Sequence, residues 1–193
     1  MMRTGSAAAA LAMGAVIALF ATVAPVRAGP AVEWAAMPLV DLEGEPVDGE
    51  DFAGRVVLLV NTASRCAFTP QYEDLEAMWD RYEALGLTVL GVPSNDFGRQ
   101  EPGSNAEIAD FCAATYAVSF PMLAKSPVTG AAAHPLFAWA REAGGRPAVP
   151  AWNFHKILIG RDGSFVTAFP SYVKPSSSDV VQHVERALGT PAI

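Results

Sequence analysis

Two runs of apolar residues in the first half of the chain predict buried strands. Residues 56–60 (VVLLV) and 87–92 (LTVLGV) have the length of a strand and almost no polar position, which is typical of strands covered on both faces of a sheet. Shorter β-like segments are a small hairpin at 37–47 that turns at Glu43-Gly44-Glu45, a short strand at 120–123, and a hairpin with arms 157–159 and 165–167 around Asp162-Gly163.

Between the strands, apolar residues recur every three or four positions, which predicts helices. One such stripe consists of Leu75, Met78, Trp79 and Tyr82. This helix is expected to begin at Thr69-Pro70, with Thr69 as the N-cap and Pro70 in the first helical position. Proline is tolerated there because its missing N–H would be unpaired in any case.

The other helices also have starting signals. Ser104 and Glu107 form a capping box, in which each side chain bonds the backbone N–H of the other. The helices expected here are one through Ile108, Phe111 and Cys112, one at 135–142, and one that begins at Ser177 and carries Val181, Val184 and Leu188. Strand–helix–strand–helix, followed by a hairpin and a helix, predicts an α/β fold with a central mixed β-sheet flanked by helices and preceded by the N-terminal hairpin.

The N-terminus has the pattern of an export signal. Arg3 precedes an apolar stretch at 7–24, and Val26-Arg27-Ala28 places small residues at the −3 and −1 positions of a cleavage site. We therefore expect a signal peptide at 1–28 and a mature domain at 29–193 in an exported, periplasmic protein. An uncleaved membrane anchor is the alternative, because a stretch of 18 residues is at the lower limit for crossing a bilayer.

Charge and cysteine content narrow the partners of the mature domain. Arg3 and Arg27 are the only charged residues among the first 28, so the remaining 165 residues carry 20 acidic and 11 basic side chains. This acidic balance disfavours nucleic acids and anionic membranes as partners. Two cysteines are too few for a disulfide-rich scaffold or a four-thiolate zinc site.

The three histidines are poor candidates for metal ligands. His134, His155 and His183 lack the close spacing of a metal site. They are expected to face solvent or to cap helices. We therefore expect no metal and no organic cofactor.

Cys66 is the strongest candidate for chemistry. It follows the strand at 56–60 and precedes Thr69 by three residues, so its sulfur is expected near the positive end of a helix, with Arg65 adjacent. Both features favour the thiolate, which is the nucleophilic form of cysteine. Composition alone favours a different reading, a structural disulfide between the two cysteines of an exported chain.

Three segments, in order along the chain, resemble the glutathione peroxidase family. Residues 61–72 (NTASRCAFTPQY) resemble its peroxidatic-cysteine segment, 91–104 (GVPSNDFGRQEPGS) its glutamine-bearing loop, and 152–156 (WNFHK) its Trp-Asn-Phe motif. The resemblance extends from about Met37 to the C-terminus and implies a thioredoxin-like fold. Selenium-containing members have selenocysteine at the position of Cys66, so the chain resembles the cysteine-containing, thioredoxin-dependent branch.

The chain departs from the family pattern at three positions within these motifs. Thr62 stands where valine is usual, Ala67 where glycine is common, and Asp96 where glutamine is usual. None of these departures removes an expected catalytic position. Asp96 would, however, add a negative charge near a thiolate, which is unfavourable.

The resemblance implies a thiol peroxidase with four catalytic residues. The Cys66 thiolate would attack the terminal oxygen of hydrogen peroxide or an organic hydroperoxide, release water or an alcohol, and become a sulfenic acid. Gln100, Trp152 and Asn153 would donate hydrogen bonds to the charge that develops on the sulfur and on the leaving oxygen.

Two roles are open for Cys112. It shares the apolar side of its expected helix with Ile108 and Phe111, as a buried small apolar residue would. Its segment, 111–121 (FCAATYAVSFP), resembles the region in which cysteine-containing members keep a resolving cysteine, and this role is favoured. To reach Cys66, part of the helix around Cys112 would have to unwind.

The resemblance to the glutathione peroxidase family also indicates which reductant is used. Residues 143–151 (AGGRPAVPA) are short where tetrameric, glutathione-using members have a longer insertion. A thioredoxin-like protein is therefore favoured as the reductant, with glutathione as the alternative, and we expect a monomer. The competing function is a non-enzymatic extracytoplasmic module in which Cys66–Cys112 is a permanent disulfide, which requires Cα atoms within about 7 Å.

Overall fold

The centre of the fold is a four-stranded sheet with strand order β2-β1-β3-β4, seen in a computed structural model that describes residues 29–189. The strands are β1 (Val56–Thr62), β2 (Leu87–Pro93), β3 (Lys156–Ile159) and β4 (Phe165–Phe169). β1 and β2 are parallel, whereas β3 is antiparallel to both β1 and β4. The expected mixed sheet is confirmed, and the expected signal peptide at 1–28 lies outside the described residues.

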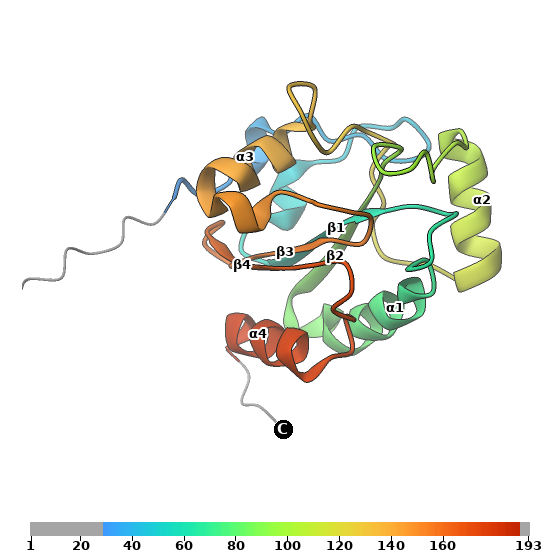
Figure 1. Cartoon of the computed structure of the whole chain (residues 1–193). Helices are drawn as coiled ribbons and strands as arrows, with labels where there is room; N and C mark the ends of the chain where they lie inside the picture. The colour runs from blue at the N-terminus through green and yellow to red at the C-terminus, as the bar shows by residue number, and fades with distance from the viewer. Residues whose placement is uncertain (1–28, 190–193) are drawn as a thin grey trace, which may run out of the picture.

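Helices cover both faces of this sheet (Figure 1). They are α1 (Gln71–Tyr82), α2 (Asn105–Tyr116), α3 (Pro135–Gly144) and α4 (Ser178–Leu188). Leu58 and Val60 of β1 pack in one core cluster with α1 and α4, while Val57 and Leu59 pack in a second cluster with α3. Because successive side chains of a strand point to opposite faces, this accounts for the unbroken apolar run of β1. No helix within 29–189 is long and apolar enough to span a membrane.

Two segments expected to form strands, 37–47 and 120–123, contribute only isolated bridges. Met122 pairs with Gly91 at the middle of β2. A Cβ atom on Gly91 would overlap the Met122 sulfur, so glycine is what lets this segment lie close to the strand.

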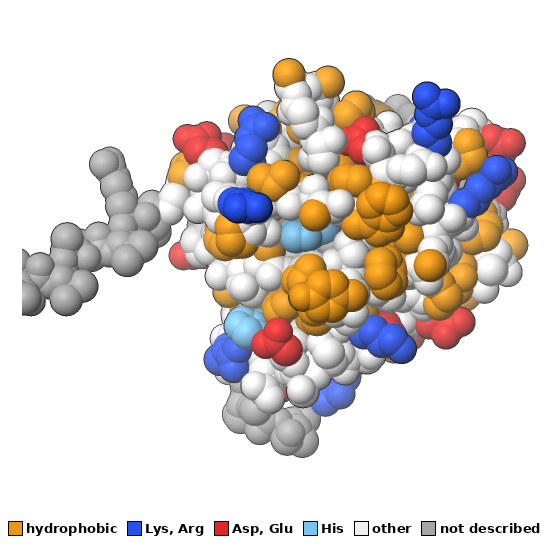
Figure 2. All heavy atoms as spheres, in the orientation of Figure 1, with side chains coloured by type: hydrophobic (Ala, Val, Ile, Leu, Met, Phe, Trp, Pro, Cys, Tyr) orange, Lys and Arg blue, Asp and Glu red, His pale blue; other side chains and the backbone are white. Residues whose placement is uncertain are grey.

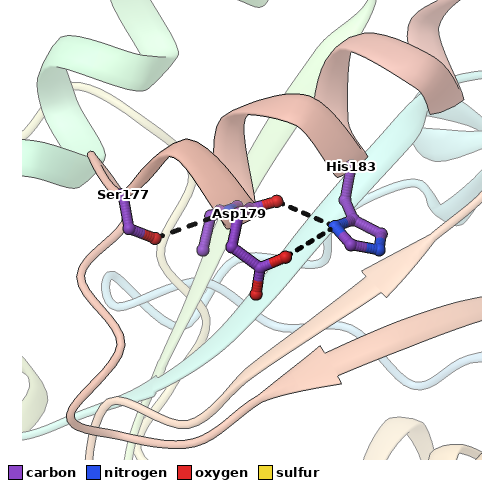
Figure 3. Close-up of polar contacts among 4 residues, drawn as sticks. Ser177, Asp179 and His183 are labelled. Atoms are coloured by element: carbon purple, nitrogen blue, oxygen red, sulfur yellow. Dashed lines mark hydrogen bonds and ion pairs between the residues drawn. The ribbon is translucent and has the colours of Figure 1, made fainter.

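The capping signals predict two helix starts correctly. Both bonds of the capping box between Ser104 and Glu107 are present at the start of α2. The hydroxyl of Ser177 accepts the N–H of Val180 at the start of α4, and one turn later the Nδ1 atom of His183 contacts Asp179 (Figure 3). The bonds made by Ser104, Glu107 and Ser177 satisfy backbone N–H groups that have no partner inside the helix.

The prediction that Thr69 caps α1 is wrong. The helix begins at Gln71, after Pro70, and no side chain caps it. The Thr69 hydroxyl instead accepts the N–H of Cys66 at 3.0 Å and lies within hydrogen-bond distance of the carbonyl oxygens of Ala63 and Cys66. The Thr69 hydroxyl therefore stabilises the turns before the helix, and does not cap the helix as the sequence pattern predicts.

Lys156 of β3 is a fully buried lysine. Its Nζ atom donates to the carbonyl oxygens of Val173 at 2.6 Å and Ser171 at 3.3 Å, and Gln71 Nε2 donates to the same Ser171 oxygen at 2.7 Å. Burial lowers the pKa of Lys156 to about 7, although Asp74 favours the charged form. Lys156 and Gln71 together hold the turn after β4 against the beginning of α1.

The buried Lys156 predicts a pH-dependent stability. Above pH 7 the folded chain has released this proton, whereas an unfolded chain keeps it up to the ordinary lysine pKa, so Lys156 makes folding more favourable as pH rises toward about 10.4. Lys156→Met removes this contribution. The difference in the free energy of unfolding, wild type minus variant, should therefore increase by roughly 1 kcal/mol for each pH unit. Urea unfolding from pH 7 to pH 9 measures this difference.

Lys174 provides the matched control, since it is an exposed lysine just beyond the same turn. Lys174→Met should differ from the wild type by a constant amount over this pH range. A difference between wild type and Lys156→Met that stays constant with pH would show that Lys156 is charged in the folded protein.

Candidate active site

Three loops from distant parts of the sequence meet at one edge of the sheet. Because β1 and β2 are parallel, with Thr62 opposite Pro93, their carboxyl ends lie at the same edge. β3 runs the other way, with Lys156 opposite Val60, so it begins where β1 ends. The loop with Cys66 follows β1, the loop with Gln100 follows β2, and Trp152-Asn153 lie in the loop that leads into β3 (Figure 1).

Cys66 lies in the turns that lead into α1. Its side chain is almost buried, with 8% of the residue's surface exposed. The sulfur accepts the backbone N–H of Phe68 at 3.4 Å, and the Cys66 N–H is held by Thr69. The sulfur thus lies in the turns just before α1 and accepts one backbone N–H there, near the helix start as the sequence predicts.

Gln100 and Asn153 lie side by side at this edge. The amide nitrogen of Asn153 donates to the Gln100 oxygen Oε1 at 2.9 Å, and the Gln100 carbonyl oxygen accepts the backbone N–H of Arg65 at 3.0 Å. Within residues 29–189, no hydrogen bond occupies the Gln100 amide nitrogen. Its two N–H groups are therefore available to an oxygen that enters the site.

Trp152 lies at the surface of the site. The residue is 39% exposed, and its ring lies 5.8 Å from that of Phe97, centre to centre. No described residue bonds its indole N–H. Among the described residues, the Phe68 N–H is the one hydrogen-bond donor to the Cys66 sulfur, and the side chains of the expected donors reach it by no direct hydrogen bond.

Asn61 holds the loop before β3 in place, a role that the sequence does not reveal. Its side chain donates to the Trp152 carbonyl oxygen at 3.1 Å and accepts the His155 N–H at 3.1 Å, while its own carbonyl oxygen accepts the Phe154 N–H at 2.6 Å. In the sequence, the available signal is that Asn61 is a polar residue at the end of an apolar strand. In the structure the residue is fully buried, and buried polar groups need hydrogen-bond partners.

Phe154 has a strained backbone between these bonds. Its φ is +62°, a conformation that residues other than glycine rarely adopt. The ring is fully buried and packs edge-on against Tyr72, at 5.3 Å between centres. The bonds of Asn61 on both sides of Phe154 hold this conformation and so fix the direction of the adjacent Asn153.

Glu101 is a second supporting residue that the sequence does not reveal. Its carboxylate accepts both the backbone N–H and the hydroxyl of Ser64, at 2.9 Å and 3.1 Å, and only 1% of the residue is exposed. Burial raises the pKa of Glu101, while the two bonds from Ser64 lower it. Glu101 therefore ties the turn before Cys66 to the loop that carries Gln100.

Asp96 has its own hydrogen-bond partners, away from the expected donors. One carboxylate oxygen accepts the backbone N–H groups of Val128 and Thr129 and the Thr129 hydroxyl, at 2.8–2.9 Å. These three bonds compensate the negative charge, and none of them comes from a site residue.

The histidine predictions hold for two of the three residues. His134 caps α3 through a bond from the Leu136 N–H, and His183 is partly exposed on α4. The prediction is wrong for His155, which is 5% exposed and is held by a bond from its N–H to Asn61, 94 positions away. Burial, with the nearby Lys156, lowers its pKa to about 4. Within 29–189, no group of three or more His, Cys, Asp or Glu side chains could hold a metal ion.

Cys112 is buried in α2, with 3% of its surface exposed, which confirms the burial expected from its apolar neighbours. Both cysteines are free thiols in this structure. Burial raises the pKa of Cys112. The residue lines a cavity of about 540 Å³ between α2, the segment at 41–47 and the segment at 118–123.

One exposed aromatic residue, Tyr172, lies near the residues that follow Cys66. Tyr172 is 73% exposed and lines a cavity of about 360 Å³ together with Ala67 and Phe68, the residues that follow Cys66. Figure 2 shows hydrophobic side chains gathered over the middle of one face, with charged side chains toward its margin. The cavity beside Ala67 and Phe68 has apolar lining from these residues and Tyr172, and charged lining from Asp74 and Lys174.

Comparisons with known proteins identify the family to which the chain is similar. The glutathione peroxidase family model matches residues 35–141. The chain is 44% identical over 155 residues to hydroperoxy fatty acid reductase gpx1 of Synechocystis sp., covering 76% of this chain and 90% of that protein. It is 43% identical over 141 residues to glutathione peroxidase-like peroxiredoxin HYR1 of Saccharomyces cerevisiae, covering 72% and 86%.

Solved structures with a similar fold include one glutathione peroxidase-like protein and one thioredoxin-family protein. The crystal structure of Trgpx in its apo form superimposes with a TM-score of 0.65 at 33% identity, covering 85% of this chain and all of that one. A thioredoxin-family thiol:disulfide interchange protein from Chlorobium tepidum matches with a TM-score of 0.62 at 17% identity, covering 86% and 100%, and shows the shared fold. The fold is therefore thioredoxin-like, and the chain belongs to the glutathione peroxidase family.

Proposed function

We propose that this chain is a thiol-dependent peroxidase that reduces hydrogen peroxide and organic hydroperoxides with Cys66 as the peroxidatic cysteine. The curated relatives are named as peroxidases, peroxiredoxins or hydroperoxy fatty acid reductases, so fatty acid hydroperoxides belong among the substrates to be tested. The observation that carries the proposal is the pair formed by Asn153 and Gln100 at the sheet edge that also presents Cys66.

The proposed reaction uses the free N–H groups of this edge. The Cys66 thiolate attacks the terminal peroxide oxygen, the O–O bond breaks, and the sulfur becomes a sulfenic acid. Gln100 Nε2 and the Trp152 indole donate to the peroxide oxygens as charge develops on them, directly or through a water molecule. Asn153, which the sequence predicts to be a third donor to these atoms, gives an N–H to the Gln100 oxygen instead. It thereby orients Gln100 so that the amide presents only donors.

We further propose that Cys112 resolves the sulfenic acid by forming a disulfide with Cys66. The two cysteines are separated by 46 positions and lie in the same core cluster. A protein of the thioredoxin type would then reduce the disulfide, with glutathione as the alternative reductant, and the protein would act as a monomer. The buried thiol of Cys112 requires local opening of α2 for this step.

Export to the periplasm is the proposed location. It is supported by the basic, apolar and small-residue pattern of residues 1–28. An anchor formed by the same segment is the competing proposal.

Replacing the peroxidatic thiol should abolish activity. Cys66→Ser leaves a hydroxyl, which at neutral pH is a far weaker nucleophile than a thiolate. Peroxide consumption, measured with a thioredoxin-like protein and with glutathione in separate assays, should fall to background with both. For the first equivalent of peroxide, Cys112→Ser serves as the control because it keeps the attacking thiol. Activity in Cys66→Ser close to that of the wild type would refute the proposed reaction.

Cys112→Ser should separate the first turnover from the following ones. Consumption of the first equivalent of peroxide should match the wild type, because Cys66 is intact. Repeated turnover with the thioredoxin-like protein should fall by about tenfold or more, since the variant forms no disulfide for that protein to attack. Turnover with glutathione should fall less, because a small thiol reaches the sulfenic acid directly. Undiminished turnover with the thioredoxin-like protein would make Cys112 a core residue only.

The exported form should begin at Gly29. Expression of the full chain in a bacterium with a periplasm should give a soluble periplasmic product, and its mass should correspond to residues 29–193. Recovery of the full-length chain in the membrane fraction would instead support the anchor.

A further inference from the structure

Three polar side chains meet inside the core beneath the site: the hydroxyls of Thr62 and Tyr72 and the thiol of Cys112. Thr62 ends β1, Tyr72 lies in α1 and Cys112 lies in α2. The first two residues are fully buried, and Cys112 is 3% exposed. Neither hydroxyl has a partner at good hydrogen-bond geometry among the described residues. Such groups are costly to keep in a core, which calls for an account of their presence.

The ring of Tyr72 is fixed in place, so its hydroxyl has a defined position. Three rings contact it, with Phe154 edge-on at 5.3 Å, Tyr116 tilted at 5.4 Å and Phe120 stacked at 6.4 Å between ring centres. These contacts come from three different segments and leave the ring little freedom. The hydroxyl thereby stays beside both Thr62 and Cys112.

We propose that Tyr72 is a positioning residue for Cys112: its phenol, supported by the hydroxyl of Thr62, donates a hydrogen bond to the Cys112 sulfur when the thiol has lost its proton. Thr62 then donates to the Tyr72 oxygen, so the two hydroxyls that lack partners in the reduced structure form a short donor chain. A chain of this kind strengthens each of its bonds.

The surroundings of Cys112 make this donor important. Burial raises the pKa of the Cys112 thiol, the Tyr72 hydroxyl lowers it, and Glu101 raises it again. Other acidic residues lie around the same cavity, namely Asp41, Glu43 and Asp110. Among these described neighbours, Tyr72 is therefore the group that favours the thiolate.

For catalysis, the inference rests on the proposed role of Cys112 as the resolving cysteine. The Cys112 thiolate attacks the sulfur of the Cys66 sulfenic acid, an S–S bond forms, and the S–O bond breaks. The hydroxide that leaves takes up a proton equivalent to the one that Cys112 gave up, and water results. Peroxide is the only oxidant, and the rate depends on the fraction of Cys112 present as thiolate.

The contact is tested without peroxide chemistry in a Cys66→Ser background, where Cys112 is the only thiol. Its ionisation is followed by the ultraviolet absorbance of the thiolate against pH, with the variant that lacks both cysteines as the blank. Adding Tyr72→Phe should move the midpoint upward by about one pH unit. Thr62→Val should move it in the same direction by less. Phenylalanine keeps the ring contacts, so the fold should be retained.

Tyr116→Phe is the matched control, because it removes a phenol from the same group of rings. It should leave the midpoint unchanged. An unchanged midpoint in Tyr72→Phe, or an equal shift in Tyr116→Phe, would overturn the proposal.

The kinetic consequence is measured in the chain with both cysteines after one equivalent of peroxide. In Tyr72→Phe, disulfide formation at neutral pH should slow by about tenfold, as expected from a shift of one pH unit, and its pH profile should move to higher pH. Oxidation of Cys66 should keep its wild-type rate, and slowing of both steps alike would contradict the assignment. If Cys112→Ser shows that Cys112 resolves nothing, the proposed function fails in that step, while the titration still decides the contact between Tyr72 and Cys112.

Discussion

The hydrogen bonds of Asn61 join two of the three loops that form the candidate site, the loop after β1 and the loop before β3. This buried residue precedes Cys66 by five positions, and it bonds the backbone on both sides of Asn153. The sheet brings the three loops to one edge, but pairing of strands alone does not fix the direction of a side chain beyond the last pair. Asn61 supplies that direction, and it holds Phe154 at a positive φ that would otherwise relax.

Hydrogen bonds hold most of the polar groups around the site in fixed positions. Thr69 and Glu101 hold the backbone around Cys66, and Asn153 holds the Gln100 side chain. The amide N–H groups of Gln100 have no partner within the described residues. The Gln100 oxygen is held, and among these residues the N–H groups of the same amide are free. This arrangement is expected of a site that stabilises charge on an incoming oxygen, because the donors need no reorganisation when the charge appears.

The elements with strong local signals were predictable from the sequence, and those decided by tertiary contacts were not. The apolar runs of β1 and β2 and the capping box at Ser104 are local features, and the structure contains each of them. Thr69 was misassigned because its hydroxyl has acceptors and donors in the turn before the helix. His155 was misassigned because its burial depends on segments distant in sequence, and the supporting roles of Asn61 and Glu101 likewise depend on partners 37 to 94 positions away.

The antiparallel pairing of β3 with β1 determines when this site can exist. Cys66 leaves the ribosome long before residues 152–156, which are the segment that completes its surroundings. During synthesis, and in any unfolded chain, the thiol therefore lacks its neighbours Gln100 and Asn153 and has the reactivity of an ordinary exposed cysteine. Completion of the site is a late event that requires contacts of high sequence separation, which form slowly. Peroxidase activity would therefore report on the folding of the whole domain and not only on the segment that contains the reactive sulfur.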